Sequence, residues 1–387
     1  MSITPEPNVA SPLRPIQVEP VTDGLPAVGG IIHAVGSRSE AVRIATVLMA
    51  LKARGVPQAV ARLAGPVDAP GHAFAPDGMP RTAGLVDQRP ETEIQRTARA
   101  LSEAETLLLE HRPALVVVAG DTDGTLALAL AASKLGIQIV RLGAGLRSGD
   151  FSQSEEINRI LGDRLADLLC TDASDVGDTL MVEGIASDRV RHTGNTAIDL
   201  LRRSEPAARQ RAAWRRFELP AHGFVLATLH RAEQAGDELQ LRRVTDALCA
   251  LGQRVPVIVS VLSTTARPAT AQMVEQLRAS DVLVTGPLDY LDFLSLEQVA
   301  GAILTDSGAV QDEASALGVR CYTLRRSTER IVTLTHGTNI LLGEDPAEIA
   351  DIRLDERTAS PIPLWDGHAG ERVAAELEKR LALAIPA

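Results

Sequence analysis

The chain has few cysteines and lacks long apolar segments. Its 387 residues contain three cysteines, Cys170, Cys249 and Cys321, scattered through apolar surroundings. Such an odd, scattered set fits neither a disulfide framework nor metal-ligand spacing, so we expect no metal site and a reducing, cytoplasmic location. No apolar run approaches the roughly 18 residues of a membrane span, and the start of the chain has no signal-peptide core, so we expect neither feature.

Basic residues are outnumbered by acidic ones. Lys and Arg total 39 against 50 Asp and Glu, which gives a net charge of −11. Nucleic-acid binding relies on clustered basic side chains that neutralise phosphates, so this balance argues against a nucleic-acid partner. The length suffices for two domains that each bury a core. Residues 1–28, rich in Pro, Val and Glu without periodicity, predict a mobile tail.

Short apolar segments alternate with amphipathic helical patterns through the rest of the chain. Dense charge and prolines interrupt the alternation near residues 202–220. The pattern predicts an α/β protein with two doubly wound, three-layer domains, residues 29–203 and residues 204–387, facing one another across a cleft. The last helix is free to pack back on the first domain.

One strand–turn–helix segment has the strongest ligand-binding signal. A predicted apolar strand over residues 299–304 ends in Thr305-Asp-Ser-Gly308, and a helical pattern starts at once. Ser307 can cap this helix and Gly308 lets a ligand approach the backbone, while a helix N-terminus favours a phosphate. Glu313, nearly two turns later, could accept the hydroxyl groups of a ribose. An ordinary turn with a surface glutamate explains the same residues, so this alternative stays open.

Polar groups also follow predicted strands in the first half. Arg38 follows the first strand and Asp121 follows a later one, at the sheet edge where open α/β folds bind ligands. Glu155 and Glu156 open a helix. The interaction of acids with a helix N-terminus is a sufficient explanation for this pair, although a catalytic role is possible.

A series of short motifs follows in one order along the chain. They are Gly120-Asp-Thr122, Ala144-Gly-Leu-Arg-Ser-Gly-Asp150, Glu155-Glu-x-Asn-Arg159, Gly194-Asn-Thr196, His230-Arg231, Thr305-Asp-Ser-Gly-x-x-Gln-x-Glu313, Thr328-Glu-Arg330, His336-Gly-Thr338 and Asp366-Gly-x-Ala369. Together they resemble the UDP-N-acetylglucosamine 2-epimerase family, from about residue 30 to residue 381. The resemblance implies a glycosyltransferase-B-type fold, UDP held mainly by the second domain, a UDP-sugar substrate without a further cofactor, and a homodimer.

The resemblance also implies roles for individual residues. Ser307 and Gly308 would grip the diphosphate and Glu313 the ribose. The phosphate side of the substrate would be contacted by Arg38 and His230, and Arg147 would belong to the substrate-binding set. We expect the uracil near residues 287–293, where Tyr290 and Phe293 are the aromatic residues. Both could instead be core residues.

Members of the family remove the proton at C2 of the sugar, expel UDP, and then add UDP or water. The resemblance assigns the proton transfers to Asp121 and Glu155, with His230 as a third catalytic residue. Gly143 stands where the family has a further glutamate. We therefore expect slow or absent exchange at C2, which Gly143→Glu should raise if the loop tolerates a side chain. The alternatives are a diverged glycosyl transferase or UDP-sugar hydrolase, and a non-catalytic UDP-sugar-binding protein.

Overall fold

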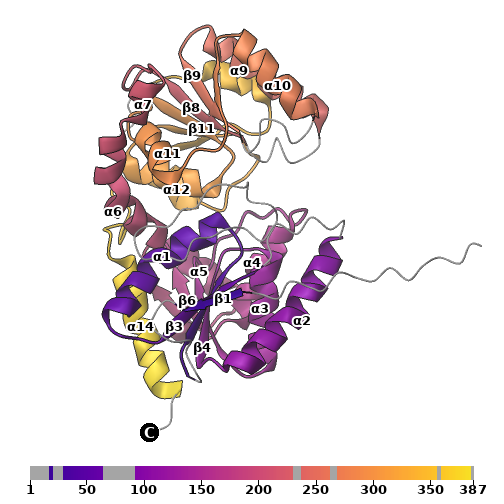
Figure 1. Cartoon of the computed structure of the whole chain (residues 1–387), viewed down its shortest axis with the longest axis vertical. Helices are drawn as coiled ribbons and strands as arrows, with labels where there is room; N and C mark the ends of the chain where they lie inside the picture. The colour runs from indigo at the N-terminus through magenta and orange to yellow at the C-terminus, as the bar shows by residue number, and fades with distance from the viewer. Residues whose placement is uncertain are drawn as a thin grey trace, which may run out of the picture.

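The computed structural model of the chain describes residues 17–20, 29–63, 92–229, 237–261, 268–354 and 359–384. These residues form two α/β domains, one above the other in Figure 1, with helix α6 (Thr196–Arg211) running between them. Each domain has a predominantly parallel sheet with a hydrophobic core on both faces. This arrangement confirms the predicted fold class.

The N-terminal sheet has seven strands in the order β1-β3-β2-β4-β5-β6-β7. Its strands are β1 (Gln17–Pro20), β2 (Ile31–Val35), β3 (Gln58–Arg62), β4 (Leu115–Ala119), β5 (Gln138–Leu142), β6 (Leu168–Thr171) and β7 (Val190–His192). Its helices are α1 (Arg38–Ala53), α2 (Glu93–His111), α3 (Asp123–Lys134), α4 (Ser154–Leu165), α5 (Asp175–Val182), the 3-10 turn η1 (Ser187–Arg189) and, from the end of the chain, α14 (Ala369–Ala384).

The strands of this sheet are apolar on both faces, as a sheet covered on both sides requires. Along β4, Leu115 and Val117 belong to the core beneath α1 and α14. Val116 and Val118 point the other way, into the core beneath α2 and α3. The turn between β2 and α1 is fixed by a capping box, in which the Ser37 hydroxyl and the Glu40 carboxylate each accept a backbone N–H of the other residue.

Residues 17–20 depart from the mobile tail predicted for residues 1–28. They form β1, which pairs antiparallel with β3 from Gln17 opposite Arg62 to Pro20 opposite Ala59. Backbone hydrogen bonds at the edge of β3 account for this strand, and such pairing needs no periodic apolar pattern in the sequence. The remaining residues of that segment lie outside the described residues.

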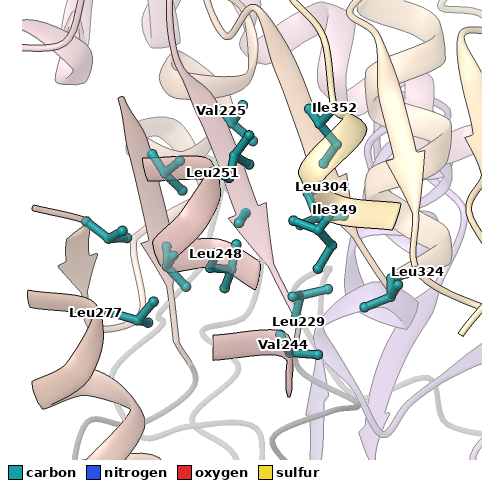
Figure 2. Packing of buried hydrophobic residues seen from close by; sticks show 14 of the residues in the cluster. Val225, Leu229, Val244, Leu248, Leu251, Leu277, Leu304, Leu324, Ile349 and Ile352 are labelled. Carbon is teal, nitrogen blue, oxygen red and sulfur yellow. The ribbon is translucent and has the colours of Figure 1, made fainter. Parts of the chain in front are cut away.

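The C-terminal sheet has six parallel strands in the order β10-β9-β8-β11-β12-β13. They are β8 (Val225–Thr228), β9 (Val257–Ser260), β10 (Leu283–Thr285), β11 (Ala302–Thr305), β12 (Cys321–Thr323) and β13 (Asn339–Leu341). The helices are α7 (Ala213–Arg216), α9 (Glu238–Gly252), α10 (Pro268–Ala279), α11 (Tyr290–Glu297), α12 (Gly308–Leu317), α13 (Ile331–Thr335) and the 3-10 helix η2 (Pro346–Asp351). In Figure 2, apolar side chains of β8, β11, α9 and the η2 region meet in one layer.

Helix α6 runs across the domain boundary predicted at residues 203 and 204. Helix α6 continues through Pro206 to Arg211, so this proline does not end the helix as expected. Proline in a helix removes one backbone hydrogen bond, and packing can offset that cost. On α6, Leu200, Leu201 and Ala208 are buried in a cluster shared with α1 and α11. These contacts keep the helix intact across the boundary.

Helix α14 returns to the N-terminal domain, an option that the sequence left open. Val373, Ala374 and Leu377 are buried in the same core as the apolar residues of α1. Figure 1 shows α14 beside α1 at the lower domain. None of the helices in the described part of the chain combines the length and the apolar character needed to cross a membrane.

Candidate functional site

The turn after β11 begins α12 at the carboxyl edge of the C-terminal sheet. Ser307 occupies the N-cap position, yet its side chain makes no capping hydrogen bond, so the prediction that it caps the helix is wrong. Its amide donates to Thr305 Oγ1 at 3.0 Å. A Cβ atom on Gly308 would lie 2.5 Å from Oε1 of Glu329. The glycine therefore makes room for a carboxylate beside the helix N-terminus.

Glu329 is an anion held among arginines. Arg325 Nη2 donates to its Oε2 at 2.9 Å, and Arg330 Nε lies 3.8 Å from its Oε1. Burial alone would raise the pKa of Glu329, but the charges of Arg325, Arg330 and Arg159 outweigh it and hold the pKa well below the ordinary value. Arg159 belongs to the N-terminal domain, so the N-terminus of α12 lies close to the boundary between the domains.

Glu313 is not a surface residue, although the simplest interpretation of the sequence allowed one. It is 7% exposed on α12 and faces Arg38 of the N-terminal domain as well as Tyr290 and Glu297 of α11. Burial raises the pKa of the Glu313 carboxyl to about 7, while the charge of Arg38 and a hydrogen bond from Tyr290 act in the opposite direction. The structure thus brings two predicted binding residues, Arg38 and Glu313, together across the domain boundary.

The two aromatic residues predicted near the uracil are packed in hydrophobic clusters. Tyr290 is 3% exposed and lies with Val42 and Leu294 in the cluster between α1, α6 and α11. The Arg38 guanidinium lies 5.9 Å from the centre of its ring. Phe293 packs in the other core of the C-terminal domain. These contacts favour the core role over base stacking, for which the sequence left both possible.

Asp121 follows β4 and is held by α4. Arg159 Nη1 donates to Asp121 Oδ2, and Asn158 Nδ2 donates to the Asp121 carbonyl at 2.9 Å. The Asp121 side chain is still 34% exposed. Glu155 is half-buried and precedes Arg159 by four residues, so both side chains lie on one face of α4. Glu155 therefore lies on the face of α4 from which Arg159 binds Asp121.

Arg147, predicted to contact substrate, is held by two acids of the N-terminal domain. Its guanidinium binds both carboxylate oxygens of Glu183 at 2.8 Å each, and Asp163 at 2.8 Å. Glu156, the second acid of the Glu-Glu pair, accepts backbone N–H groups of Ser148 and Gly149 at 3.0 and 2.9 Å. Both side chains thus fix the conformation of the loop between β5 and α4.

Position 143 cannot hold a glutamate side chain without rearrangement. Gly143 follows β5 with a φ of +66°, in the left-handed region that favours glycine. A Cβ atom there would lie 2.6 Å from Nη1 of Arg43 and 3.5 Å from Oδ2 of Asp172. The Gly143→Glu variant, predicted to raise C2 exchange only if the loop tolerates a side chain, would therefore strain the backbone and displace Arg43.

A cluster of buried charges crosses the domain boundary. Arg43 forms a 2.7 Å ion pair with Asp172 and lies 3.5 Å from Asp312 of α12. Arg330 lies 3.3 Å from Asp172 and 3.4 Å from Asp312, and Asn195 Nδ2 donates to Asp312 at 3.0 Å. Burial raises the pKa of Asp312 to about 6, against the opposing effect of both guanidinium groups. The cluster ties α1 and the end of β6 to the C-terminal domain.

Sequence reasoning missed Arg43, Asp172 and Asp312 as residues of this region. A signal was available in α1, where Glu40 and Arg43 interrupt an otherwise apolar helical stripe, since buried charges in such a stripe require partners. Glu40 is buried and accepts the Gly36 N–H at 2.6 Å and the Thr125 hydroxyl at 2.9 Å. Burial raises its pKa to about 7. His230, predicted as a catalytic and phosphate-side residue, lies outside the described residues.

The comparison with known families agrees with this geometry. The model of the family described as UDP-N-acetylglucosamine 2-epimerase matches residues 80–378. The chain belongs to this family. A UDP-N-acetylglucosamine 2-epimerase of Methanocaldococcus jannaschii is 34% identical over 296 residues, which cover 73% of this chain and 80% of the relative. The resemblance inferred from the motifs is confirmed.

A second relative and a solved structure also resemble this chain. A UDP-2,3-diacetamido-2,3-dideoxy-D-glucuronate 2-epimerase of Pseudomonas aeruginosa is 36% identical over 309 residues, 78% of this chain and 85% of the relative. The crystal structure of the Methanocaldococcus jannaschii UDP-GlcNAc 2-epimerase in complex with UDP-GlcNAc and UDP matches with a TM-score of 0.77 at 29% identity. That match covers 90% of this chain and 99% of the solved one.

Proposed function

We propose that this protein is a UDP-sugar 2-epimerase that eliminates UDP across C1 and C2 and then adds UDP or water to the glycal. The proposal rests on polar side chains of the two domains that approach one another at the carboxyl edges of the two sheets. Arg38 of the N-terminal domain faces Glu313 of the C-terminal domain. Arg330 of the C-terminal domain interacts electrostatically with Asp121 of the N-terminal domain. The solved structure of the Methanocaldococcus jannaschii epimerase, which matches 90% of this chain, contains UDP-GlcNAc and UDP.

The nucleotide binds mainly to the C-terminal domain in this proposal. The diphosphate lies at the N-terminus of α12, near Ser307 and Gly308, where backbone N–H groups and the helix dipole favour an anion. Glu313 accepts the ribose hydroxyl groups, and Arg38 neutralises charge from the opposite domain. The Glu329 carboxylate beside Gly308 repels the phosphates, so arginines are needed around them.

The sugar binds against the N-terminal domain, where Asp121 and Glu155 lie. A carboxylate removes the proton at C2, the C2–H electron pair forms the C1–C2 double bond, and the C1–O bond breaks so that its electrons leave with UDP. Nearby guanidinium groups stabilise the charge that develops on the departing diphosphate. His230 is an additional candidate for proton transfer on the resemblance alone.

A UDP-GlcNAc-like sugar is the proposed substrate class. Support comes from the related crystal structure that contains UDP-GlcNAc, and from relatives named as 2-epimerases of UDP-GlcNAc and of a diacetamido glucuronate. The acetamido group at C2 is common to these sugars. Homodimer formation and a cytoplasmic location stay predictions.

Deuterium incorporation tests the proposal. The protein is incubated in heavy water with UDP-GlcNAc and, separately, with the diacetamido glucuronate donor, and C2 of the recovered sugar is followed by NMR. Although the replacement at Gly143 predicted slow or absent exchange, membership of the epimerase family leads us to expect deuterium at C2 with at least one donor. Release of UDP without C2 exchange would instead indicate the hydrolase or transferase alternative. Binding of a donor without turnover would indicate the binding-protein alternative.

A further inference from the structure

Asp172 places a carboxylate next to the position where the family glutamate is missing. β5 and β6 pair in parallel with Leu142 opposite Cys170, so Gly143 and Asp172 both lie just beyond the ends of neighbouring strands. The Asp172 Oδ2 atom is 3.5 Å from the point where a Cβ of residue 143 would stand. A carboxylate is therefore present in this volume, delivered by the adjacent strand.

The surroundings of Asp172 fix its position and connect it to both domains. Trp365 Nε1 donates to the Asp172 carbonyl at 3.0 Å, which anchors the backbone. The carboxylate receives Arg43 Nη1 at 2.7 Å and Arg330 Nη1 at 3.3 Å. The side chains of Asp172, Arg43 and Arg330 are 6%, 7% and 11% exposed. Such a buried carboxylate would be costly to keep in the fold without its partners.

The same neighbourhood contains the first predicted acid. Arg330 interacts electrostatically with Asp121 as well as with Asp172 and Asp312. Asp121 and Asp172 thus lie on the N-terminal side of one guanidinium group, at the ends of β4 and β6. Both acids are therefore on the side of the domain boundary where the proposed function places the sugar.

We propose that Asp172 supplies the carboxylate that position 143 lacks and exchanges the proton at C2 of the sugar. The inference rests on the proposed function. An oxygen of Asp172 takes the C2 proton, the C2–H electrons form the C1–C2 double bond, and UDP leaves with the electrons of the C1–O bond. In the reverse step the protonated Asp172 returns the proton to C2 as UDP adds to C1.

Substrate charge explains how Asp172 becomes available for this step. Arg43 and Arg330 have guanidinium groups whose fork geometry matches phosphate oxygens. When the diphosphate enters, these groups turn toward it and release the Asp172 carboxylate to the sugar. A glutamate at position 143 would collide with the Arg43 guanidinium. Asp172 instead forms an ion pair with that group.

Asp172→Asn tests this role, because asparagine keeps the size of the side chain and still offers Arg43 an acceptor oxygen. We expect the variant to fold and to bind UDP with wild-type affinity by calorimetry. Its C2 exchange and kcat should fall by about 10²–10⁴-fold, the typical contribution of one acid or base, with little change in KM. Asp172→Glu retains a carboxylate and should keep more exchange than Asp172→Asn.

Asp188→Asn is the matched control, since Asp188 is exposed and precedes β7 at the amino end of the strands, whereas Asp172 follows the carboxyl end of the neighbouring β6. Wild-type C2 exchange in Asp172→Asn would overturn the proposal. The proposal would also be overturned if both Asp172 variants lost UDP binding and unfolding free energy together with activity. That result would assign Asp172 a structural role. Absence of C2 exchange in the wild-type protein with either donor would refute the proposed function itself, a separate result that the variants do not affect.

Discussion

At the scale of single residues, burial and arginine charge act in opposite directions on the acids of the domain boundary. For Glu329, three arginines outweigh burial and lower the pKa. For Asp312, burial outweighs Arg43 and Arg330 and raises the pKa to about 6. Glu313 behaves like Asp312, with a pKa near 7. Burying such an acid lowers the stability of the fold. Natural proteins retain residues of this kind where binding or catalysis requires them.

Glu297 is an acid for which the proposed function has no use. It is fully buried on α11, and burial together with the nearby Glu313 raises its pKa well above the ordinary value of 4.5. Because the folded-state pKa exceeds the unfolded-state one, the folded chain binds the extra proton. Stability associated with Glu297 is therefore complete below about pH 4.5 and is lost progressively as the pH rises toward the raised value.

Glu297→Met should stabilise the protein by about 1–3 kcal/mol at pH 8, the usual cost of an unsatisfied buried polar group. The gain should shrink as the pH falls toward 4.5 and level off below it, where the wild-type carboxyl is protonated in both states. Urea unfolding at several pH values measures the free energy. Glu348→Met, at an exposed position of η2, is the control and should show no such pH dependence. An equal gain at every pH would contradict the assignment to proton binding.

Individual side chains were predicted with uneven success, for physical reasons. Arg38 and Glu313 meet because the carboxyl ends of parallel strands define one edge of each sheet, which the strand pattern already reveals. The contacts of Arg147 with Glu183 and Asp163 could not be predicted, because neither acid is near it in the sequence. Its contact with substrate stays a prediction. The approach of Asp172 to Gly143 depends on the pairing of β5 with β6, which no local pattern encodes.

At the scale of elements, the attachment of α14 depends on one cap supplied by a distant helix. Asp199 of α6 is 5% exposed, and its Oδ2 accepts the Gly370 N–H at 2.6 Å. Gly370 lies in the first turn of α14, so this carboxylate satisfies a free N–H of the helix and interacts with its positive end. Asp199 thereby joins the helix between the domains to the last helix of the chain.

Asp199→Ala should lower the unfolding free energy by about 1–2 kcal/mol, as loss of a helix cap does. Amide exchange in residues 369–377 should accelerate at the same time, because the first turn of α14 loses its anchor. Asp199→Asn retains an acceptor oxygen and should lose much less. Unchanged exchange in α14 in the alanine variant would show that the packing of Val373 and Leu377 is sufficient to hold it.

Elements with strong patterns were predicted from sequence, and others depended on tertiary contacts. The apolar run of β4 forms the strand that was expected to precede Asp121. β3 was not predicted, because Gln58 and Arg62 at its ends are polar and yet buried. Gln58 is satisfied by His33 Nε2 at 3.0 Å, a partner from the neighbouring strand. Pro206 was taken as a break, whereas packing on both sides of α6 preserves the helix.

At the scale of the whole molecule, two sheets are joined by contacts of different kinds. Helices α6 and α14 make the chain pass twice between the domains, as Figure 1 shows. Apolar packing of α6 with α1 and α11 supplies one part of the boundary. The ion-pair cluster around Arg43 and Asp312 supplies another. A ligand that binds both domains should therefore protect segments far apart in the sequence.

UDP should slow backbone hydrogen exchange in two segments, the start of α1 with Arg38 and the start of α12 with Ser307. A ligand at about 100 times its Kd stabilises the bound state by about 2.7 kcal/mol, so exchange through openings that release UDP should slow by about 100-fold. Mass spectrometry of peptides from both segments, with and without UDP, measures this. The exposed η1 segment, at the far edge of the N-terminal sheet, should not change. Protection limited to α12 would mean that the nucleotide contacts the C-terminal domain alone and that Arg38 has no part in binding it.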